Sequence, residues 1–353
     1  MFAGEAAQAD ALNACLTRGG AAVTVGRSLT PVGIAALGGD LSSFDAVLVW
    51  PGEPASTQAP EPAPLAALLA LVAAIEAMPA ARRPALHCVG EMEAGAYRPL
   101  AAALAALCRS LHEEAPELRL GMIGVDAALD AEARAAALAG ELAAARGVES
   151  ERWVSAAGTR LPRLVAATPL ANVAAPSLRA DRSYLVTGGT GALGALFSRA
   201  LIEAGARDVV LSSRRGPDAE PPGLRALAEA HGARLSVIAA DLADAASVER
   251  LFAQLAREHA PLAGLVHAAG QVADAAHAGL DADAFRRVFE AKVEGAWRLD
   301  AACRELELDF FLMLSSISGV LGAPGQANYA AANAALDALA RRRHAEGRPA
   351  LSL

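Results

Sequence analysis

Aromatic side chains are scarce in this chain, so a hydrophobic core cannot be built mainly from large rings. They account for 4% of the 353 residues, whereas hydrophobic residues as a whole account for 54% and charged residues for 20%. That apolar share supports a large core of small aliphatic side chains and argues against wholesale disorder. At about 150 residues per domain, the length predicts roughly two domains.

Cysteine is also rare, and its spacing excludes the sites that paired cysteines build. The four cysteines, Cys15, Cys88, Cys108 and Cys303, include no C-x-x-C pair. They are typical of buried thiols in a reducing compartment and indicate neither a disulfide framework nor a zinc site. We therefore expect no bound metal.

A net positive charge and long apolar runs are missing as well. The formal net charge is −8, and the sequence contains no recognisable basic face, which argues against a general nucleic-acid partner. No strongly apolar run reaches the length of about 18 residues that predicts a membrane span, and no signal peptide is recognisable at the N-terminus. We expect a cytoplasmic protein with neither a nucleic-acid nor a membrane partner.

Short apolar runs alternate with helical patterns in the first half of the chain. Strands are expected at Ala21–Val25, Ala46–Trp50, Ala85–Val89, Leu118–Val125 and Leu161–Leu164, and helices at Leu100–His112, at Asp130–Arg146 and up to about Met78. The alternation predicts a parallel sheet with helices on both faces. The only near candidate for a glycine-rich turn, Gly38-Gly39-Asp40, follows no clear buried strand. We expect a Rossmann-like sheet without a nucleotide site.

The second half repeats the alternation more regularly. Strands are expected at Ser183–Thr187, Asp208–Ser212, Arg234–Ala239, Gly264–His267 and Phe310–Leu314, and helices up to Ala204, at Gly223–His231, at Ala246–Glu258, at Asp283–Leu299 and from Asn328. Successive βα units predict a doubly wound parallel sheet. The expected organisation is a structural subdomain over 1–175 and a cofactor-binding subdomain over 176–353, joined by an Ala-, Pro- and Ser-rich linker at 166–180.

A glycine motif follows the first strand of the second half. Gly188, Gly191 and Gly194 have the spacing G-x-x-G-x-x-G, with a strand before them and a helix after them. Glycines there permit a tight turn and let a pyrophosphate approach the helix N-terminus. The motif, which also contains Gly189, Thr190 and Leu193, predicts nucleotide binding. The alternative is an ordinary glycine turn.

The end of the second strand selects the cofactor. An acidic residue there would favour NAD, but this chain has Ser213-Arg214-Arg215. An arginine can pair with the 2′-phosphate of NADP through charge-assisted hydrogen bonds. Asp241 and Leu242 end the third strand, where the adenine edge would lie. The alternatives are a solvated basic turn and a helix-capping aspartate.

A second group of polar residues lies further along the chain. Ser315 and Ser316 follow a buried strand, at the edge where ligands bind in open α/β sheets. Tyr329 and Asn333 are four residues apart on one expected helix, and Lys292 is on the preceding one. An ammonium group makes a nearby phenol a better proton donor, and a serine hydroxyl can hold a carbonyl oxygen. The alternative is a surface tyrosine with a solvated lysine.

Five stretches now identify a resemblance. YLVTGGTGALG, VLSSRRG, VHAAG, KVEGAWRL and LSSISGVLGAPGQANYAAANAALDALA look like the ketoreductase domains of modular polyketide synthases, which are complex members of the short-chain dehydrogenase/reductase superfamily. The resemblance is specific from about 181 to 353. From about 20 to 170 it is weaker and rests on strand order and on LPRL before the linker. The first half resembles the family's structural subdomain, a truncated Rossmann fold.

The resemblance implies roles for the polar residues. Simpler relatives carry Tyr-x-x-x-Lys, whereas this chain has Asn333 four residues after Tyr329 and a lysine upstream at Lys292, as the complex ketoreductases do. Tyr329 would be the proton donor and Ser316 would position the ketone. Lys292 and Asn333 would support the proton relay, and the hydride would come from NADPH. The cofactor site would also include Ala268, Ala269 and Gly270 of the VHAAG stretch.

The implied reaction is reduction of a β-ketoacyl thioester that is tethered to an acyl carrier protein, with other polyketide synthase domains as partners. The alternatives are a free-standing short-chain reductase of a small carbonyl and a non-catalytic scaffold of the same fold. The chain ends at Pro349-Ala350-Leu351-Ser352-Leu353, inside an expected strand, and Met1 is followed by a helix-like segment. We therefore expect a fragment of a larger enzyme, which is not necessarily active alone.

Two positions bear on stereochemistry in this family. An Asp shortly after HAAG marks one hydroxyl configuration, and here that position is Asp274. A Trp eight residues before the tyrosine marks the other, and here that position is Leu321. Two residues after Tyr329, where the epimerising subtype of the family carries proline, this chain has Ala331. The resemblance implies a B-type outcome, a (3R)-hydroxyacyl product without epimerisation; the alternative is that Asp274 is a solvated loop residue.

Overall fold

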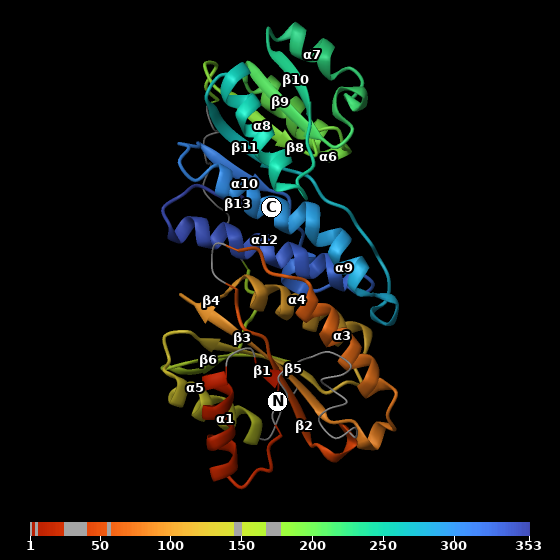
Figure 1. Ribbon diagram of the computed structural model, residues 1–353, viewed down its shortest axis with the longest axis vertical. Coiled ribbons are helices and arrows are strands. Elements are labelled where there is room, and N and C mark those ends of the chain that lie inside the picture. Colours follow the sequence, from red (N-terminus) through yellow and green to blue (C-terminus); the bar gives the residue numbers. More distant parts are fainter. Residues whose placement is uncertain (1, 4–5, 25–40, 55–57, 145–149, 167–177) are drawn as a thin grey trace. The chain divides into compact units, whose positions relative to one another are not determined.

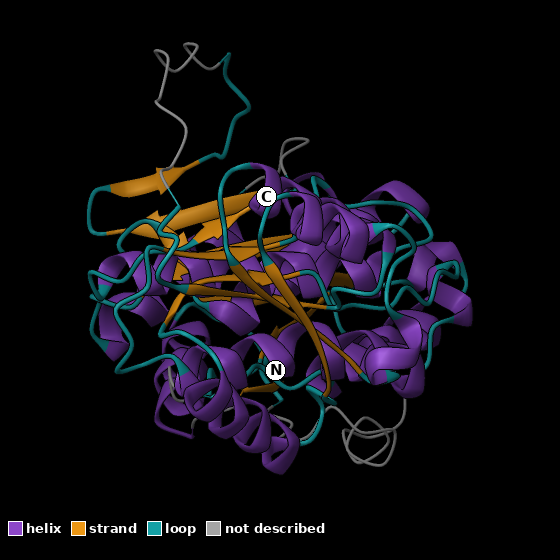
Figure 2. Ribbon diagram, turned by 90° about the horizontal axis from the view of Figure 1, so that it is seen from above, coloured by secondary structure: helices purple, strands orange, loops and turns teal. Residues whose placement is uncertain are grey.

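The computed structural model describes residues 2–3, 6–24, 41–54, 58–144, 150–166 and 178–353. The chain forms two compact units. Unit 1 comprises Met1–Leu164, Ala273–Arg286 and Ile317–Ala338, and unit 2 comprises Val165–Val272, Arg287–Ser316 and Leu339–Leu353. Figure 1 labels the elements, and Figure 2 shows the strands in orange and the helices in purple. The assignment of 1–175 to a structural half and of 176–353 to a catalytic half stays a prediction.

Unit 1 is built on a largely parallel sheet in the order β1-β2-β3-β5-β6-β7. Its strands are β1 (Phe2–Ala3), β2 (Ala46–Trp50), β3 (Ala85–Glu93), β4 (Ala96–Tyr97), β5 (Leu120–Asp126), β6 (Glu151–Ser155) and β7 (Gly158–Arg160). Its helices include α1 (Ala6–Arg18), α3 (Ala63–Glu76), α4 (Pro99–Glu114) and α5 (Ala131–Ala143). Only β4 and β7 run antiparallel to their partners, each as the second strand of a hairpin. The expected parallel α/β sheet in the first half is therefore confirmed.

Helices cover both faces of this sheet (Figure 1). Leu12 of α1 and Leu138 of α5 join one buried cluster with strand residues such as Trp50 and Ile123. On the other face α4 lies so close to β3 that a Cβ on Gly90 would come within 2.5 Å of the Ala101 Cβ. The alanine-rich composition and the glycine together permit this close helix-on-sheet packing.

Four sequence expectations in this half need comment. Leu161–Leu164 is irregular rather than a strand, because Pro162 has no N–H to donate to a ladder and the strand ends at Arg160 in β7. Residues 21–24 are irregular, and the rest of the expected strand Ala21–Val25 lies outside the described residues. Gly38-Gly39-Asp40 and most of the expected linker, residues 167–177, also lie outside them.

Unit 2 contains a parallel sheet in the order β10-β9-β8-β11-β12-β13. Its strands are β8 (Ser183–Thr187), β9 (Asp208–Ser213), β10 (Arg234–Ala239), β11 (Leu262–His267), β12 (Phe310–Met313) and β13 (Leu351–Ser352). Its helices include α6 (Ala192–Glu203), α7 (Leu224–Ala230), α8 (Ala245–Glu258) and α10 (Gly295–Ala302). Counted from β8, this is the strand order 3-2-1-4-5-6 of dinucleotide-binding folds. The expected doubly wound sheet is confirmed, and a strand does form at Leu351–Ser352.

Three more α-helices lie in the described part of the chain. They are α9 (Ala282–Phe289), α11 (Ser318–Leu321) and α12 (Ala327–Ala345). The division between the units falls inside α9 and inside α12. None of the helices in the described part of the chain is long and apolar enough to span a membrane.

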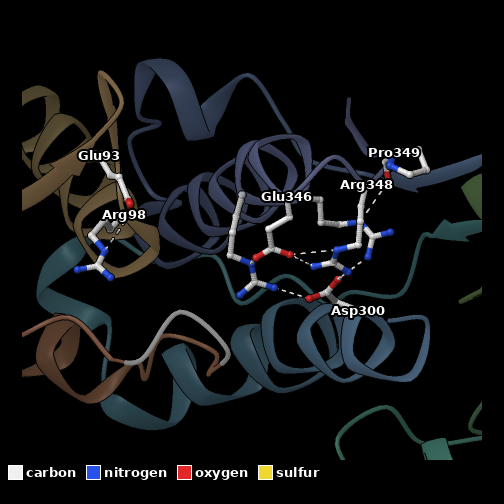
Figure 3. Close-up of polar contacts among 8 residues, drawn as sticks. Glu93, Arg98, Asp300, Glu346, Arg348 and Pro349 are labelled. Carbon is white, nitrogen blue, oxygen red and sulfur yellow. Dashed lines mark hydrogen bonds and ion pairs between the residues drawn. The ribbon is translucent and has the colours of Figure 1, made fainter. Parts of the chain in front are cut away.

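A buried ion network ties α10 to the end of α12 in unit 2 (Figure 3). Asp300 of α10 accepts hydrogen bonds from Arg342, Arg343 and Arg348. The side chains of Asp300 and Arg343 are only 2% and 1% exposed. Burial alone would raise the pKa of Asp300, but the hydrogen bond from Arg348 and the charges of the other two arginines outweigh it and lower that pKa.

The same network fastens the segment that leads into β13. Arg343 Nε donates to the carbonyl oxygen of Pro349 at 3.1 Å. The Arg343 guanidinium also lies 4.2 Å from the centre of the Phe311 ring, so a cation–π contact supports it from β12. The last strand of the sheet is thus attached to the core by charge as well as by strand pairing.

Candidate active site

A cleft of about 600 Å³ lies in unit 2 at the carboxyl ends of the central strands. Its lining comes from the segments after β8, β9, β10 and β11, together with one residue after α9: Gly188, Thr190, Gly191, Ser212, Ser213, Arg214, Arg215, Ala240, Asp241, Leu242, Ala268, Ala269, Gly270, Gln271 and Ala291. The strand order reverses between β8 and β11, and such a switch point is where ligands bind in open α/β sheets. The volume is within the usual range for small-molecule sites.

The glycine motif shapes the floor of this cleft. Gly188 has φ +65°, and a Cβ there would come within 2.7 Å of the Ala269 backbone. At Gly194 a Cβ would lie 2.3 Å from the Gly188 carbonyl oxygen, so this glycine brings α6 against the turn. Gly191 is the N-cap of α6, and as a glycine it offers no side chain to cap the helix. The backbone N–H groups of α6 are therefore available to an anion.

Three of the expected cofactor residues, Gly189, Leu193 and Gly194, are not among the lining residues. Gly189 packs against Leu211 of β9, where a Cβ would be 2.8 Å from the leucine Cβ. Leu193 is 57% exposed in the first turn of α6. The sequence reasoning missed Gln271 and Ala291 as lining residues, because neither carries a motif signal.

Polar groups line the rim where the second strand ends. Arg214 and Arg215 are both exposed there. The Ser213 hydroxyl oxygen is buried and has no hydrogen-bond partner among the described residues. The Ser213 hydroxyl is therefore able to bond to a ligand or a water in the cleft. An open helix N-terminus, a basic rim and an unpaired hydroxyl together fit a phosphorylated dinucleotide.

Asp241 plays a local role as well as lining the cleft. Its Oδ1 accepts a hydrogen bond from the Ala243 amide at 3.0 Å, which closes a turn. The cap of α8 is instead Asp244, whose Oδ1 accepts from the Ala246 amide at 3.0 Å. The alternative that Asp241 itself caps this helix is therefore wrong, and its placement beside the cleft is retained.

Lys292 lies in a π-helical turn, Glu290–Glu294, between α9 and α10. The single helix expected over Asp283–Leu299 is thus interrupted, and π-turns are frequent at functional sites. The lysine is 5% exposed, and its Nζ donates to the carbonyl oxygen of Leu314 at 2.7 Å. A Cβ on Gly270 would lie 3.8 Å from that Nζ. The ammonium therefore reaches the carboxyl ends of β11 and β12, beside the cleft.

His267, at the end of β11, explains the interruption. Its Nε2 lies 2.9 Å from the carbonyl oxygen of Lys292, and its Nδ1 lies 2.8 Å from the Thr187 hydroxyl. Because a carbonyl can only accept, Nε2 carries the proton and Nδ1 accepts from the threonine. The imidazole thus takes a hydrogen bond from β8 and gives one to a carbonyl within the π-turn. Sequence reasoning treated this histidine only as the end of a strand.

Burial lowers the pKa of His267 to about 4, so the ring is neutral near pH 7. An unfolded histidine titrates near 6.5, so below that pH the unfolded chain binds a proton that the folded chain refuses. We expect the free energy of unfolding to fall as the pH drops from about 6.5 to about 4, by about 2–3 kcal/mol from this group. Urea unfolding at pH 7.5 and at pH 4.5 measures this change in the free energy of unfolding.

The matched variant for this prediction is His267→Gln, which keeps a hydrogen-bonding side chain that does not titrate. The variant should lose less stability than the wild type over the same pH interval. Equal losses in both proteins would show that His267 is not the group responsible.

The remaining residues of the predicted catalytic group are divided between the two units. Ser316 follows β12 in unit 2 and is half-buried. Tyr329 and Asn333 lie in the part of α12 that belongs to unit 1. Asn333 is fully buried, and its Nδ2 donates to the Tyr329 carbonyl oxygen at 2.9 Å. The structure therefore joins Tyr329 with Asn333, and Lys292 with the end of β12; the meeting of all four side chains stays a prediction.

The segment with Asp274 lies beside the start of α12. Asp274 Oδ2 accepts a hydrogen bond from Gln326 Nε2 at 2.9 Å. The Ala275 amide donates to the Gly325 carbonyl oxygen at 2.9 Å, and Asn328 Nδ2 donates to the Ala273 carbonyl oxygen at 2.9 Å. Asp274 is therefore held next to the turn that precedes Tyr329, although its side chain is exposed.

In unit 1 the N-terminus of α4 differs from the N-terminus of α6 in unit 2. The Glu53 carboxylate accepts hydrogen bonds from the amides of Leu100 and Ala101, at 3.1 and 2.6 Å, in the first turn of α4. Burial raises the pKa of Glu53 to about 7. A side chain of the protein thus occupies this helix N-terminus, whereas that of α6 is open. This contrast supports the expectation that the first half binds no nucleotide. The described residues contain no group of His, Cys, Asp and Glu side chains that could hold a metal ion.

Comparison with known proteins gives a consistent result. The family model described as "KR domain" matches residues 182–353. The structure of PlmKR1, a ketoreductase from the first module of phoslactomycin biosynthesis in Streptomyces sp. HK803, is 34% identical, with 93% of this chain and 76% of that chain covered and a TM-score of 0.75. A structure described as an A1-type ketoreductase is 32% identical, with 96% and 74% covered and a TM-score of 0.80.

A curated relative adds the wider context. The putative inactive phenolphthiocerol synthesis polyketide synthase type I Pks1 of Mycobacterium tuberculosis is 47% identical over 185 residues, which is 50% of this chain and 11% of that relative. The chain thus spans about a tenth of the length of that curated relative.

Proposed function

The chain belongs to the ketoreductase-domain family of modular polyketide synthases, and we propose that it reduces a β-ketoacyl thioester to a β-hydroxyacyl thioester with NADPH. The observation that carries the proposal is the cleft at the β8/β11 switch point, with the open N-terminus of α6 on its floor and Lys292 beside Gly270. The substrate would be carried by an acyl carrier protein, with other synthase domains as neighbours. Curated relatives such as Pks1 are described as polyketide synthases, which supports these partners.

The residues of this chain would divide the work as follows. The α6 N-terminus and the basic rim would bind the cofactor, which supplies a hydride when bound. Ser316 would hold the ketone oxygen, and Tyr329 would give that oxygen a proton as negative charge develops on it. Lys292 and Asn333 would position Tyr329 and help to return a proton to its hydroxyl after each turnover. The hydrogen bond from Asn333 to the Tyr329 carbonyl oxygen supports a positioning role.

Asp274 would decide from which side the tethered chain enters, and this entry side sets which face of the ketone meets the hydride. Its hydrogen bond to Gln326, in the turn before Tyr329, supports that role. Leu321 occupies the position where the opposite subtype carries tryptophan, and it is 46% exposed in α11. We propose a (3R)-hydroxyacyl product without epimerisation.

Cofactor choice tests the proposal at the basic rim. Arg214→Ala should weaken NADPH binding roughly ten- to hundredfold, because a charge-assisted hydrogen bond to the 2′-phosphate contributes about 1.5–3 kcal/mol. NADH lacks that phosphate, so its dissociation constant should be unchanged. Titration calorimetry or fluorescence with both cofactors measures this.

The matched control for this variant is Arg199→Ala, which removes an exposed arginine of α6 that pairs with Glu203 away from the cleft. It should leave both dissociation constants at wild-type values. Equal affinity of the wild type for NADPH and NADH would refute the assignment of NADPH.

A further inference from the structure

The C-terminal half of α4 carries three polar side chains, Arg109, Ser110 and Glu114, that contact segments far away in the sequence. We call them the α4 anchors. Arg109 is fixed by a bidentate pair with Glu151 of β6, at 2.8 and 2.9 Å. Ser110 is fully buried and donates to the Ala106 carbonyl oxygen at 2.9 Å. Arg109 and Ser110 are therefore held by contacts within their own helix and sheet, independently of any loop.

Each anchor holds one point of the segment 317–326, which consists of α11 and the turn after it, precedes Tyr329 and is called the 317–326 loop below. Arg109 Nη1 donates to the Gly319 carbonyl oxygen at 3.2 Å. The Ala323 amide donates to Ser110 Oγ at 3.0 Å. The Gly325 amide donates to Glu114 Oε1 at 2.8 Å. The loop is thus held to α4 at its beginning, its middle and its end.

The loop backbone also packs directly against this helix. Gly322 has φ +79°, and a Cβ there would come within 2.7 Å of the Ser110 amide nitrogen. A larger residue would push the loop away from α4 and would be strained in that backbone conformation. The loop that carries Leu321 therefore takes its position from α4.

Glu114 holds a second loop with its other oxygen. Oε2 accepts hydrogen bonds from the His277 amide at 2.7 Å and from His277 Nδ1 at 2.9 Å. The His277 Nε2 lies 3.1 Å from both carboxylate oxygens of Glu76, at the end of α3. Burial alone would lower the pKa of His277, but its bonds to Glu114 and Glu76 raise that pKa. The His277 ring is thus held between the Glu114 and Glu76 carboxylates, and these contacts fix the loop that contains Asp274.

We propose that Glu114 is a positioning residue that couples the two loops flanking Tyr329, and that this coupling maintains the stereochemistry of the reduction. One carboxylate fixes Gly325 on one loop and His277 on the other. The loops carry Leu321 and Asp274, the two positions that the proposed function assigns to stereocontrol. This inference rests on that proposed function. It gives the non-catalytic half a specific chemical task, since α4 belongs to the first half of the sequence.

The test compares Glu114→Ala with two matched variants. Glu76→Ala removes a carboxylate that contacts His277 but neither Gly325 nor another residue of 317–326 in the described part of the chain, and Glu113→Ala removes the exposed glutamate next to Glu114. Amide hydrogen exchange at Gly325 and His277 reports the coupling directly. Chiral analysis of the product, kcat, and the dissociation constant of NADPH report its consequence.

Glu114→Ala should speed exchange at both amides, lower kcat roughly tenfold to a hundredfold and erode the stereochemical purity of the product. NADPH affinity should stay unchanged, because the cofactor cleft is lined by unit 2 residues. Glu76→Ala should speed exchange at His277 but not at Gly325, and Glu113→Ala should resemble the wild type. Loss of stereochemical purity is a readout that a merely structural role would not produce.

Unchanged exchange at either amide in Glu114→Ala would overturn the coupling, and faster exchange with unchanged stereochemical purity would overturn its role. If Glu114→Ala does not fold, Glu114→Gln, which keeps the side-chain volume, is judged by the same two readouts. A wild type that reduces no β-ketoacyl thioester would refute the proposed function instead, and the exchange data would still decide the coupling.

Discussion

Tyr329→Phe is expected to lower kcat for thioester reduction by about 10²- to 10⁴-fold, the range that a positioned proton donor contributes. The substitution removes one hydroxyl and keeps the ring, so α12 and its packing should persist. The Asn333 side chain donates to the backbone of residue 329, which the substitution leaves in place. NADPH should therefore bind with wild-type affinity while the alkoxide lacks its proton. Steady-state kinetics and cofactor titration on the same preparation separate the two effects.

Tyr184→Phe is the matched control, because it makes the same change away from the proposed site. Its hydroxyl accepts a hydrogen bond from the Arg179 amide at 2.6 Å, at the far end of β8 from the glycine turn. That variant should keep near-wild-type kcat. If Tyr329→Phe turns over as fast as Tyr184→Phe, the assignment of the proton donor is wrong.

Asp300→Ala is expected to produce the largest loss of stability. Its carboxylate is the shared partner of Arg342, Arg343 and Arg348, and it is nearly inaccessible to water. Removing one partner of a buried ion pair leaves an uncompensated charge and costs about 3–5 kcal/mol. Arg343 would suffer most, because its side chain is only 1% exposed. Urea unfolding monitored by circular dichroism gives the change in free energy.

The exposed pair between Arg179 and Asp309, at 2.9 Å, provides the comparison. Its two side chains are 41% and 40% exposed, and such surface pairs contribute about 0–1 kcal/mol. Asp309→Ala should therefore cost far less than Asp300→Ala. Similar small losses for both variants would mean that the network around α12 is not an important source of stability.

Local pattern predicted much of unit 2, because its signals are short-range. Gly188 and Gly191 follow a buried strand and precede a helix, and the structure places both in the lining of the cleft. Arg214, which follows β9 and was predicted from the basic turn there, also lines this cleft. In each case the residue and its structural context lie within a few positions of each other in the sequence, so periodicity and turn chemistry were sufficient.

Features that depend on distant partners were not predictable in this way. The π-turn at Lys292 requires the imidazole of His267, which lies 25 positions earlier in the sequence. The inclusion of residues 273–286 and 317–338 in unit 1 likewise depends on long-range partners such as Glu114. At Leu161–Leu164 the hydrophobic pattern suggested a strand, but Pro162 removes a donor and the neighbouring sheet edge offers no partner within the described residues.

The central claim is that this chain transfers hydride from NADPH to a β-ketoacyl thioester, and deuterium transfer under single-turnover conditions tests it most directly. The purified protein is mixed with a β-ketoacyl thioester and NADPH deuterated at the nicotinamide C4, and the product is analysed by mass spectrometry. The account predicts a β-hydroxyacyl thioester with deuterium on C3, formed far faster than by Tyr329→Phe. A protein that binds NADPH but transfers deuterium no faster than that variant would contradict the account and indicate a non-catalytic scaffold.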